Sequence, residues 1–215
     1  MPPVGFGIIG AGNIGPVHAA AINEVRSAKL VAVADVVQAS AERLASQYGA
    51  DAYDDHKAML ARPDIKAVSL CVPSGMRAEF IADCAKAGVH VLSEKPLDVP
   101  AQRVDQAVKA ADDAGILLGC IFQNRFASGA QTIRKALDDG RFGKLVMGDA
   151  YIKWYRSQAY YDSGAWRGTW KLDGGGALMN QAIHPVDLLR WFMGDVKRVT
   201  ARTALRAHAG NAVQD

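Results

Sequence analysis

A glycine-rich turn near the start of the chain has the composition of a phosphate-binding loop. The apolar run Val4–Ile9 leads into Gly10-Ala11-Gly12-Asn13-Ile14-Gly15, and residues with helical spacing follow. In a strand–turn–helix unit the first glycine permits a tight turn, the second lets a pyrophosphate approach the backbone, and the third lets the helix pack on the strand. The free N–H groups and the helix dipole then favour phosphates. The same pattern occurs in plain tight turns and in methyl-donor-binding domains, so a methyltransferase stays open as an alternative.

Asp35 is a candidate partner for a ribose. It ends the next apolar run, Leu30–Ala34, and lies twenty residues after Gly15. A carboxylate at this place can accept hydrogen bonds from both hydroxyl groups of an adenosine ribose. Val36 and Val37 follow it, and neither can neutralise the 2′-phosphate of NADP. The sequence therefore predicts NAD as the cofactor and disfavours NADP.

A lysine follows another apolar run in the sequence Ser93-Glu94-Lys95-Pro96. Ligands of an open parallel sheet bind beyond the carboxyl ends of its strands, so Lys95 is expected to point toward the binding crevice. There its ammonium group can polarise a substrate oxygen. The alternative is a surface lysine before a loop proline, and position alone does not separate the two.

A second group of polar residues follows the three glycines at 174–176. These glycines allow a close backbone approach to a flat ligand, or they form a flexible linker. Asn180 and His184 are four residues apart, which predicts that they share one helical face, and Pro185 predicts a kink beside His184. His184 is a candidate acid–base group or a structural histidine. We interpret the other four histidines as structural: His18, His56, His90 and His208.

The elements that must position these residues alternate between short apolar runs and longer amphipathic ones. This alternation predicts an α/β fold with a doubly wound parallel sheet. The expected strands are Val4–Ile9, Leu30–Ala34, Ala67–Val72, His90–Ser93 and Leu117–Ile121. The expected helices are Pro16–Val25, Ala39–Tyr48, His56–Arg62, Arg77–Ala87 and Pro100–Ala114.

The pattern changes after Phe122, which predicts a dinucleotide-binding domain at 1–122 and a second, partial domain for substrate binding and oligomerisation at 123–215. A two-stranded sheet is at best marginal alone, so this part is expected to be incomplete. Its expected elements are a helix at Ser128–Asp139, a strand at Leu145–Tyr155, a loop at 156–176, a helix at Leu178–Met193 and a strand at Val196–Leu205.

The composition is that of an ordinary globular chain. Of its 215 residues, 50% are hydrophobic and 22% are charged, and the mean hydropathy is −0.01. No apolar run approaches the ~18 residues of a membrane span, and Met1-Pro2-Pro3 lacks a basic leader, so no membrane partner is expected. The three cysteines, Cys71, Cys84 and Cys120, have no metal-ligand spacing. They indicate reduced thiols in a cytoplasmic protein.

Charge and aromatic side chains are unevenly distributed. The net charge of +3 argues against a nucleic-acid-binding surface. Residues 1–120 contain 11 Lys and Arg against 14 Asp and Glu, whereas residues 121–215 contain 14 against 8. The basic second half can attract an anionic substrate, or it can be a solvated basic surface. Seven of the 16 aromatic residues lie between 151 and 170, where they can stack on sugar faces or pack in a core.

The glycine turn with Asp35, the Glu94-Lys95-Pro96 sequence and the segment from Gly174 to His184 resemble the Gfo/Idh/MocA family of oxidoreductases, in the same order along the chain. The resemblance implies a Rossmann domain, then an α+β domain with an open, mainly antiparallel sheet. It implies an NAD(P)-dependent dehydrogenase acting on a hydroxyl of a sugar, polyol or nucleotide-sugar derivative. The segments Tyr160-Tyr161, Trp166–Trp170 and Ala177–Gln181 are most similar to members that act at C3 of UDP-linked N-acetyl sugars or sugar acids.

The resemblance also implies roles for individual residues. Lys95 would be the active-site lysine, His184 the acid–base histidine and Asn180 a positioning residue. The cofactor would contact Gly10, Gly12, Asn13, Ile14, Gly15, Asp35, Val72, Pro73, Ser74, Glu94, Lys95, Gln123, Trp166 and Arg167.

The chain departs from the family pattern in three respects. Asn180 stands where many members have an aspartate, and Arg77 stands where many have a histidine. Members are also considerably longer, which implies that most of the C-terminal sheet follows Asp215 and that the chain is truncated, with a homo-oligomer expected at full length. The remaining alternative is a non-catalytic dinucleotide-binding module or an inactive fragment of such an enzyme.

Overall fold

The computed structural model describes residues 2–213, which form two compact units. The first unit extends to Ile121 and the second begins at Phe122. Among the described residues, no helix is both long enough and apolar enough to cross a membrane.

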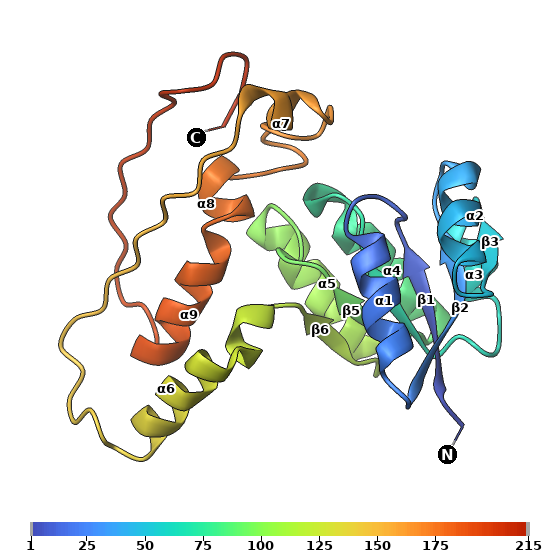
Figure 1. Cartoon of the computed structure of the whole chain (residues 1–215), viewed down its shortest axis with the longest axis horizontal. Coiled ribbons are helices and arrows are strands. Elements are labelled where there is room, and N and C mark those ends of the chain that lie inside the picture. Colours follow the sequence, from blue (N-terminus) through green and yellow to red (C-terminus); the bar gives the residue numbers. More distant parts are fainter. Residues whose placement is uncertain (1, 214–215) are drawn as a thin grey trace. The chain divides into compact units, whose positions relative to one another are not determined.

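The described part of the first unit is built on a six-stranded parallel sheet with the order β3-β2-β1-β4-β5-β6 (Figure 1). This is the order of doubly wound dinucleotide-binding sheets, whose ligands bind where the chain changes direction between β1 and β4. The predicted fold class is therefore confirmed for this unit. The strands are β1 (Val4–Ile9), β2 (Ala28–Ala34), β3 (Asp51–Tyr53), β4 (Ala67–Leu70), β5 (His90–Ser93) and β6 (Leu118–Cys120).

Two hydrophobic clusters cover the two faces of this sheet. Neighbouring strand residues point to opposite faces, so Ile8 packs with residues of α1 and α2, whereas Ile9 packs with residues of α3, α4 and α5. Burial on both faces explains why the strands are continuous apolar runs. The helices are α1 (Gly15–Glu24), α2 (Gln38–Ser46), α3 (His56–Leu60), α4 (Arg77–Ala87) and α5 (Ala101–Asp113), with a 3₁₀ turn, η1, at Ser74–Met76.

β3 is an element that the sequence did not indicate. It has three residues and pairs with β2 through Asp51, Ala52 and Tyr53. A strand this short shows no alternation of apolar and polar residues, and its first residue is an aspartate, a residue type depleted in strands. Its place beside β2 depends on the neighbouring strand and not on a local pattern.

The second unit consists of helices joined by extended segments. Arg134 of α6 donates a hydrogen bond to the carbonyl of Trp191 in α9 at 2.7 Å, and Arg125 forms an ion pair with Asp187 at 2.5 Å. These contacts fix α9 against α6 and the 3₁₀ turn before it. The elements are η2 (Gln123–Phe126), α6 (Ser128–Asp138), α7 (Gln158–Asp162), α8 (Gly176–Asn180) and α9 (Ile183–Met193).

The two strands expected in this unit are absent among its described residues, 122–213, so these two predictions are wrong and the antiparallel sheet does not form there. Figure 1 shows Leu145–Tyr155 and Val196–Leu205 as extended chain. Their apolar side chains face solvent, with Val146 89% exposed and Val199 80% exposed. A strand exists only when a partner accepts and donates its backbone hydrogen bonds, and the β-type residue pattern of these segments does not supply that partner.

The helix predicted over Leu178–Met193 is also wrong in one respect, because two helices replace it. α8 ends at Asn180, and α9 begins at Ile183. Pro185 has no N–H group to donate to the carbonyl of Gln181, so the helical hydrogen bonding is interrupted between the two. The break therefore lies before His184, and Pro185 sits within the first turn of α9. Asn180 and His184 belong to different helices and do not share one helical face.

Candidate functional site

The glycine turn between β1 and α1 has the geometry of a phosphate-binding loop. Gly10 has a φ of +101°, and a Cβ there would lie 2.9 Å from the carbonyl carbon of Cys71 on the neighbouring strand's end. A Cβ at Gly15 would lie 2.5 Å from the carbonyl oxygen of Gly10, so this glycine lets α1 start against the turn. A Cβ at Gly12 would meet nothing within 4 Å. Gly12, Asn13 and Ile14 are exposed, which leaves room for a pyrophosphate at the helix N-terminus.

Asp35 is held beside this turn. Its Oδ2 accepts a hydrogen bond from the N–H of Ala11 at 2.7 Å, and its Oδ1 accepts one from the N–H of Val37 at 2.8 Å. The backbone N–H of Asp35 donates to the carbonyl of Tyr53 on β3 at 3.0 Å. A carboxylate oxygen has more than one lone pair, so both oxygens can still accept from ribose hydroxyl groups. The residues present therefore fit the adenosine and pyrophosphate of a dinucleotide.

A buried polar network links α1 to the residue before Lys95. His18 of α1 contacts Ser69 Oγ of β4 through Nδ1 at 2.5 Å and Glu94 Oε1 through Nε2 at 3.1 Å. Glu94 Oε2 accepts the backbone N–H of Lys95 at 3.1 Å. Ser69 is 1% exposed and cannot reach a substrate, so this serine, histidine and glutamate do not act as a nucleophilic triad. They fix the backbone at Lys95 relative to the start of α1.

The Glu94 carboxylate is ionised at neutral pH. Burial on its own raises the pKa of Glu94. The hydrogen bond with His18, together with the positive charge of Lys95 and its backbone N–H, outweighs burial and lowers the pKa below its ordinary value. The negative charge therefore persists beside Lys95 through the physiological range.

Arg77 joins the loops that follow β4 and β5. It is 6% exposed, and its Nε donates to the carbonyl of Val72 at 3.1 Å while its Nη1 donates to the carbonyl of Pro96. Burial lowers the pKa of Arg77, which nearby Glu94 partly opposes. Since Val72 and Pro96 flank the crevice end of the sheet, this guanidinium holds the two loops together. The sequence marked Arg77 as a departure from the family pattern but did not predict this role.

Asp98 fixes the start of α4 in the same region. Its side chain is fully buried, and its Oδ2 accepts the N–H of Ala78 at 2.8 Å. Its Oδ1 accepts Nε of Arg103 at 3.0 Å. A carboxylate at a helix N-terminus is favoured by the helix dipole. Ser74 is 5% exposed in the turn before α4, so this predicted cofactor contact is largely buried.

The thiols near this region are not nucleophiles. Burial, followed by the charge of Glu94, raises the pKa of Cys71 to about 12. Burial raises the pKa of Cys84 to about 12 as well. Both are free thiols, and the thiolate is the reactive form of a cysteine.

In the second unit, Asn180 is tied to a carboxylate that the sequence reasoning missed. Asn180 Nδ2 donates to Asp173 Oδ1 at 2.6 Å, and Asp173 Oδ2 accepts the N–H of Gly168 at 2.8 Å. Asp173 is 2% exposed. The signal in the sequence that could have indicated it is its position directly before the three glycines. Asp173 thus approaches Asn180 from another turn of the chain and fixes its amide.

His184 is buried in the first turn of α9. It is 8% exposed, and its ring meets that of Phe122 edge-on at 6.4 Å between centroids. Asn180 and His184 thus both belong to the second unit, whereas Lys95 belongs to the first.

The remaining predicted cofactor contacts also belong to the second unit. Gln123 is exposed in η2. Trp166 and Arg167 are half-buried, and the Arg167 guanidinium lies over the Trp166 ring at 4.5 Å from the centroid.

The aromatic side chains between 151 and 170 are mostly exposed. Tyr151 is 82% exposed, Tyr155 is 74% exposed and Trp170 is 58% exposed, whereas Tyr161 is buried. Packing in a core therefore accounts for few of them. Their rings are available for contact with a ligand or with further protein.

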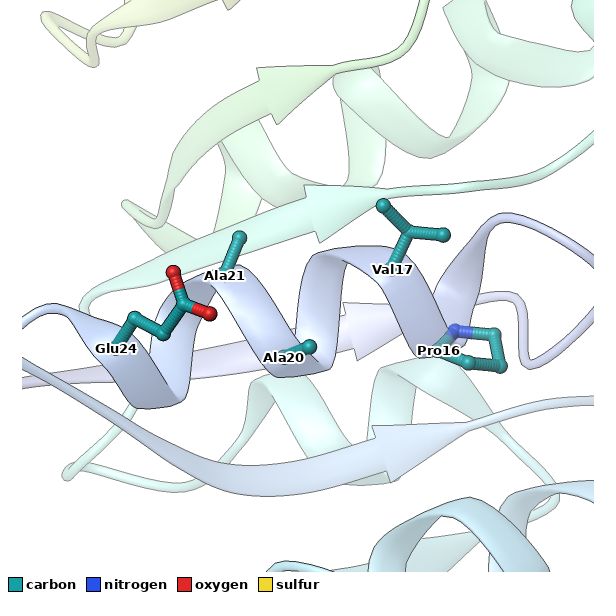
Figure 2. Close-up of a pocket in the computed structure, with 5 residues that line it drawn as sticks. All are labelled: Pro16, Val17, Ala20, Ala21 and Glu24. Atoms are coloured by element: carbon teal, nitrogen blue, oxygen red, sulfur yellow. The ribbon is translucent and has the colours of Figure 1, made fainter.

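A separate shallow hollow lies on the outer face of α1 (Figure 2). Its lining offers small apolar groups and one carboxylate, and no positively charged side chain. A phosphate group of a dinucleotide would therefore have no attractive electrostatic contact there, and the hollow is not the cofactor site. Its lining residues are Pro16, Val17, Ala20, Ala21 and Glu24.

The chain matches two family models in succession. Residues 4–122 match the model of the GFO/IDH/MocA oxidoreductase family with an NAD-binding Rossmann fold. Residues 130–215 match the GFO/IDH/MocA C-terminal domain.

Curated relatives include two sugar or polyol dehydrogenases. Inositol 2-dehydrogenase of Rhizobium meliloti is 36% identical over 94% of this chain and 59% of its own length. D-glucoside 3-dehydrogenase of Escherichia coli is 34% identical over 94% of this chain and 58% of its own length. The chain thus spans a little more than half the length of these relatives.

Two solved structures share the fold closely. The WlbA dehydrogenase of Chromobacterium violaceum, in complex with NADH and UDP-GlcNAcA, has a TM-score of 0.94 and 37% identity over all of this chain and 64% of its own. The WlbA dehydrogenase of Bordetella pertussis, with the same two ligands, has a TM-score of 0.94 and 38% identity over 99% of this chain and 66% of its own.

Proposed function

Because the chain belongs to the GFO/IDH/MocA oxidoreductase family, we propose that it serves the NAD-dependent oxidation of a hydroxyl group on a sugar, a polyol or a nucleotide-linked sugar. The observation that carries the proposal is Asp35, whose carboxylate is held 2.7 Å from the N–H of Ala11 in a glycine turn with open space at Gly12. This arrangement suits a dinucleotide without a 2′-phosphate, since the next two residues are valines with no positive charge.

The cofactor half of the site uses backbone groups and one carboxylate. The N–H groups at the start of α1 bind the pyrophosphate, and Asp35 accepts the ribose hydroxyl groups. Bound NAD supplies the hydride acceptor. Val72, Pro73 and Ser74 follow β4 at the same edge of the sheet, where Arg77 donates to the carbonyl of Val72 and Asp98 accepts the N–H of Ala78 in α4.

The chemical half uses a lysine, a histidine and an amide. His184 accepts the proton of the substrate hydroxyl as a general base, the histidine role in many such reactions. The Lys95 ammonium group binds a substrate oxygen and stabilises negative charge that develops on it. Asn180, fixed by Asp173 at 2.6 Å, orients the substrate.

Among these substrate classes, a nucleotide-linked sugar acid is the finer proposal. The two WlbA dehydrogenases bind UDP-GlcNAcA in their structures and superimpose on nearly the whole chain. The excess of 14 basic over 8 acidic residues after position 120 supports an anionic substrate.

The test is the absorbance of reduced nicotinamide after the full chain is mixed with NAD and a panel of substrates. The panel should contain a neutral sugar, an inositol, a sugar acid and their UDP-linked forms. Formation of NADH with at least one of them, lost in the His184→Ala variant, is expected. NAD binding without turnover on any substrate would instead favour a dinucleotide-binding module.

A further inference from the structure

We infer that Arg156, Arg167 and Tyr160 form a receptor for an oxyanion of the substrate, either a carboxylate of the sugar or a phosphoryl group attached to it. The two guanidinium groups lie over the ring of Tyr160 in the second unit. That the ligand is the substrate rests on the proposed function, whereas the presence of an oxyanion receptor rests on the geometry alone.

Two guanidinium groups stack on the ring of Tyr160. The central carbon of Arg167 lies 4.1 Å from the ring centroid, and that of Arg156 lies 5.2 Å from it. Arg167 Nη1 also donates a hydrogen bond to the Tyr160 hydroxyl at 2.6 Å. Cation–π contacts of this kind hold each guanidinium in place but neutralise no charge.

Both positive charges lack a carboxylate partner within the part of the chain that the structure describes. Neither Arg156 nor Arg167 has an acidic oxygen within 4.0 Å there. Arg156 Nη2 donates to the neutral amide oxygen of Gln181 at 3.1 Å, and Arg167 donates to a neutral hydroxyl. Two cations that contact the same ring without a carboxylate partner favour an anion, which would offset their charge.

The donors left over point to the same conclusion. Nε of Arg156 and Nε of Arg167 are both buried and have no hydrogen-bond acceptor among residues 2–213. A buried donor without an acceptor destabilises a protein, and such groups are rare in native structures. The Tyr160 hydroxyl accepts from Arg167 and, at 3.4 Å, from Gln181, so its own hydrogen remains to be donated.

The cluster is joined to the proposed catalytic amide. Gln181 Nε2 donates to Asn180 Oδ1 at 3.0 Å while its Oε1 accepts from Arg156. An anion on the two guanidiniums would therefore lie close to the group that orients the substrate. Planar guanidinium groups bind carboxylates and phosphates through paired N–H donors, which matches these two chemical classes and disfavours a neutral sugar.

The experiment measures binding to the full chain by isothermal titration calorimetry, and no turnover is needed. The probes are D-glucuronate for a carboxylate, UDP-glucose for a phosphoryl group and D-glucose as the neutral sugar, each titrated in the absence of NAD. NAD is titrated separately. Arg156→Met and Arg167→Met should each weaken binding of the anionic probe about tenfold or more while D-glucose binding is unaffected, and Arg156→Met should leave NAD binding unchanged. Arg198→Met, which removes an exposed charge of the same unit, is the matched control and should change nothing.

Loss of D-glucuronate binding alone identifies a carboxylate receptor, and loss of UDP-glucose binding alone identifies a phosphoryl receptor; both support the inference. Arg156→Lys and Arg167→Lys keep the charge but not the paired donors, and they serve as the test where a methionine variant fails to fold. The inference is overturned if the wild-type chain binds neither anionic probe, if the variants bind them normally, or if only NAD binding falls. The calorimetric titration does not depend on turnover. A chain that binds the anion in this titration but forms no NADH in the turnover assay would therefore count against the proposed function and not against this inference.

Discussion

Replacing Asp35 by asparagine tests the cofactor site most directly. The carboxylate accepts the N–H groups of Ala11 and Val37, at 2.7 and 2.8 Å, and it is proposed to accept two ribose hydroxyl groups as well. Asparagine has the same shape and keeps one acceptor oxygen, so Asp35→Asn removes the charge with little change in volume. Asp35→Ala removes the charge and both backbone contacts.

The expected magnitudes differ between these two variants. A hydrogen bond to a charged group contributes about 1.5–3 kcal/mol, and about 1.4 kcal/mol corresponds to tenfold in affinity. We expect the wild-type chain to bind NAD about tenfold or more tightly than NADP, and Asp35→Asn to reduce this preference by about tenfold or more, because repulsion of the 2′-phosphate also disappears. Asp35→Ala leaves two backbone N–H groups without their acceptor, at about 1 kcal/mol each, so it should also weaken both dinucleotides and lower the melting temperature.

The assay is a calorimetric titration of the full chain with NAD and with NADP at one fixed salt concentration. Asp112→Asn is the matched control, because Asp112 is an exposed aspartate on α5 and belongs to the same unit. The control should leave both affinities unchanged. Equal wild-type affinities for the two dinucleotides, or an unchanged preference in Asp35→Asn, would refute the role assigned to Asp35.

Three further predictions concern the reaction, acid stability and the thiols. In a chain that turns over substrate, His184→Ala should lower turnover by about 10²–10⁴-fold with NAD affinity unchanged, and Lys95→Ala should also lower turnover. Steady-state kinetics of both single variants and of the double variant check this prediction. Normal turnover of His184→Ala would contradict it. The folded pKa of Glu94 lies below its ordinary value, so its contribution to stability is present above that value and is lost as the pH falls through the folded pKa. As the pH falls below about 5, Glu94→Gln should therefore lose less stability than the wild-type chain in urea unfolding, and identical acid curves would contradict this. The pKa values of Cys71 and Cys84 are raised to about 12, so in the folded chain both thiols should react with iodoacetamide about 10³-fold more slowly than an ordinary thiol. Mass spectrometry after timed quenching measures the labelling rate. Labelling of the folded chain at the rate of the urea-unfolded chain would refute this prediction.

The sequence by itself determined the parts of the first unit that depend on local chemistry. The apolar runs and the glycine turn predicted the doubly wound sheet, because a buried parallel strand must be apolar on both faces and because Gly10 needs a positive φ. Asp35 followed from its position at the end of a strand. In the second unit, local periodicity found the helix at Ser128–Asp138, whose apolar and polar faces are clearly separated.

The tertiary structure alone decided which residues became partners. His18 and Glu94 are 76 positions apart, and no local pattern connects a helix residue to the carboxylate at a distant strand end. The pairing of Asn180 with Asp173, and of Arg156 with Gln181, likewise depends on how the turns fold back. The expected strands at Leu145–Tyr155 and Val196–Leu205 show the same limit, because alternation predicts which side chains share a face but not whether a neighbouring strand completes the hydrogen bonds. Local sequence sets the conformations available to a segment, whereas backbone pairing and buried polar contacts depend on groups that only the folded chain brings within reach.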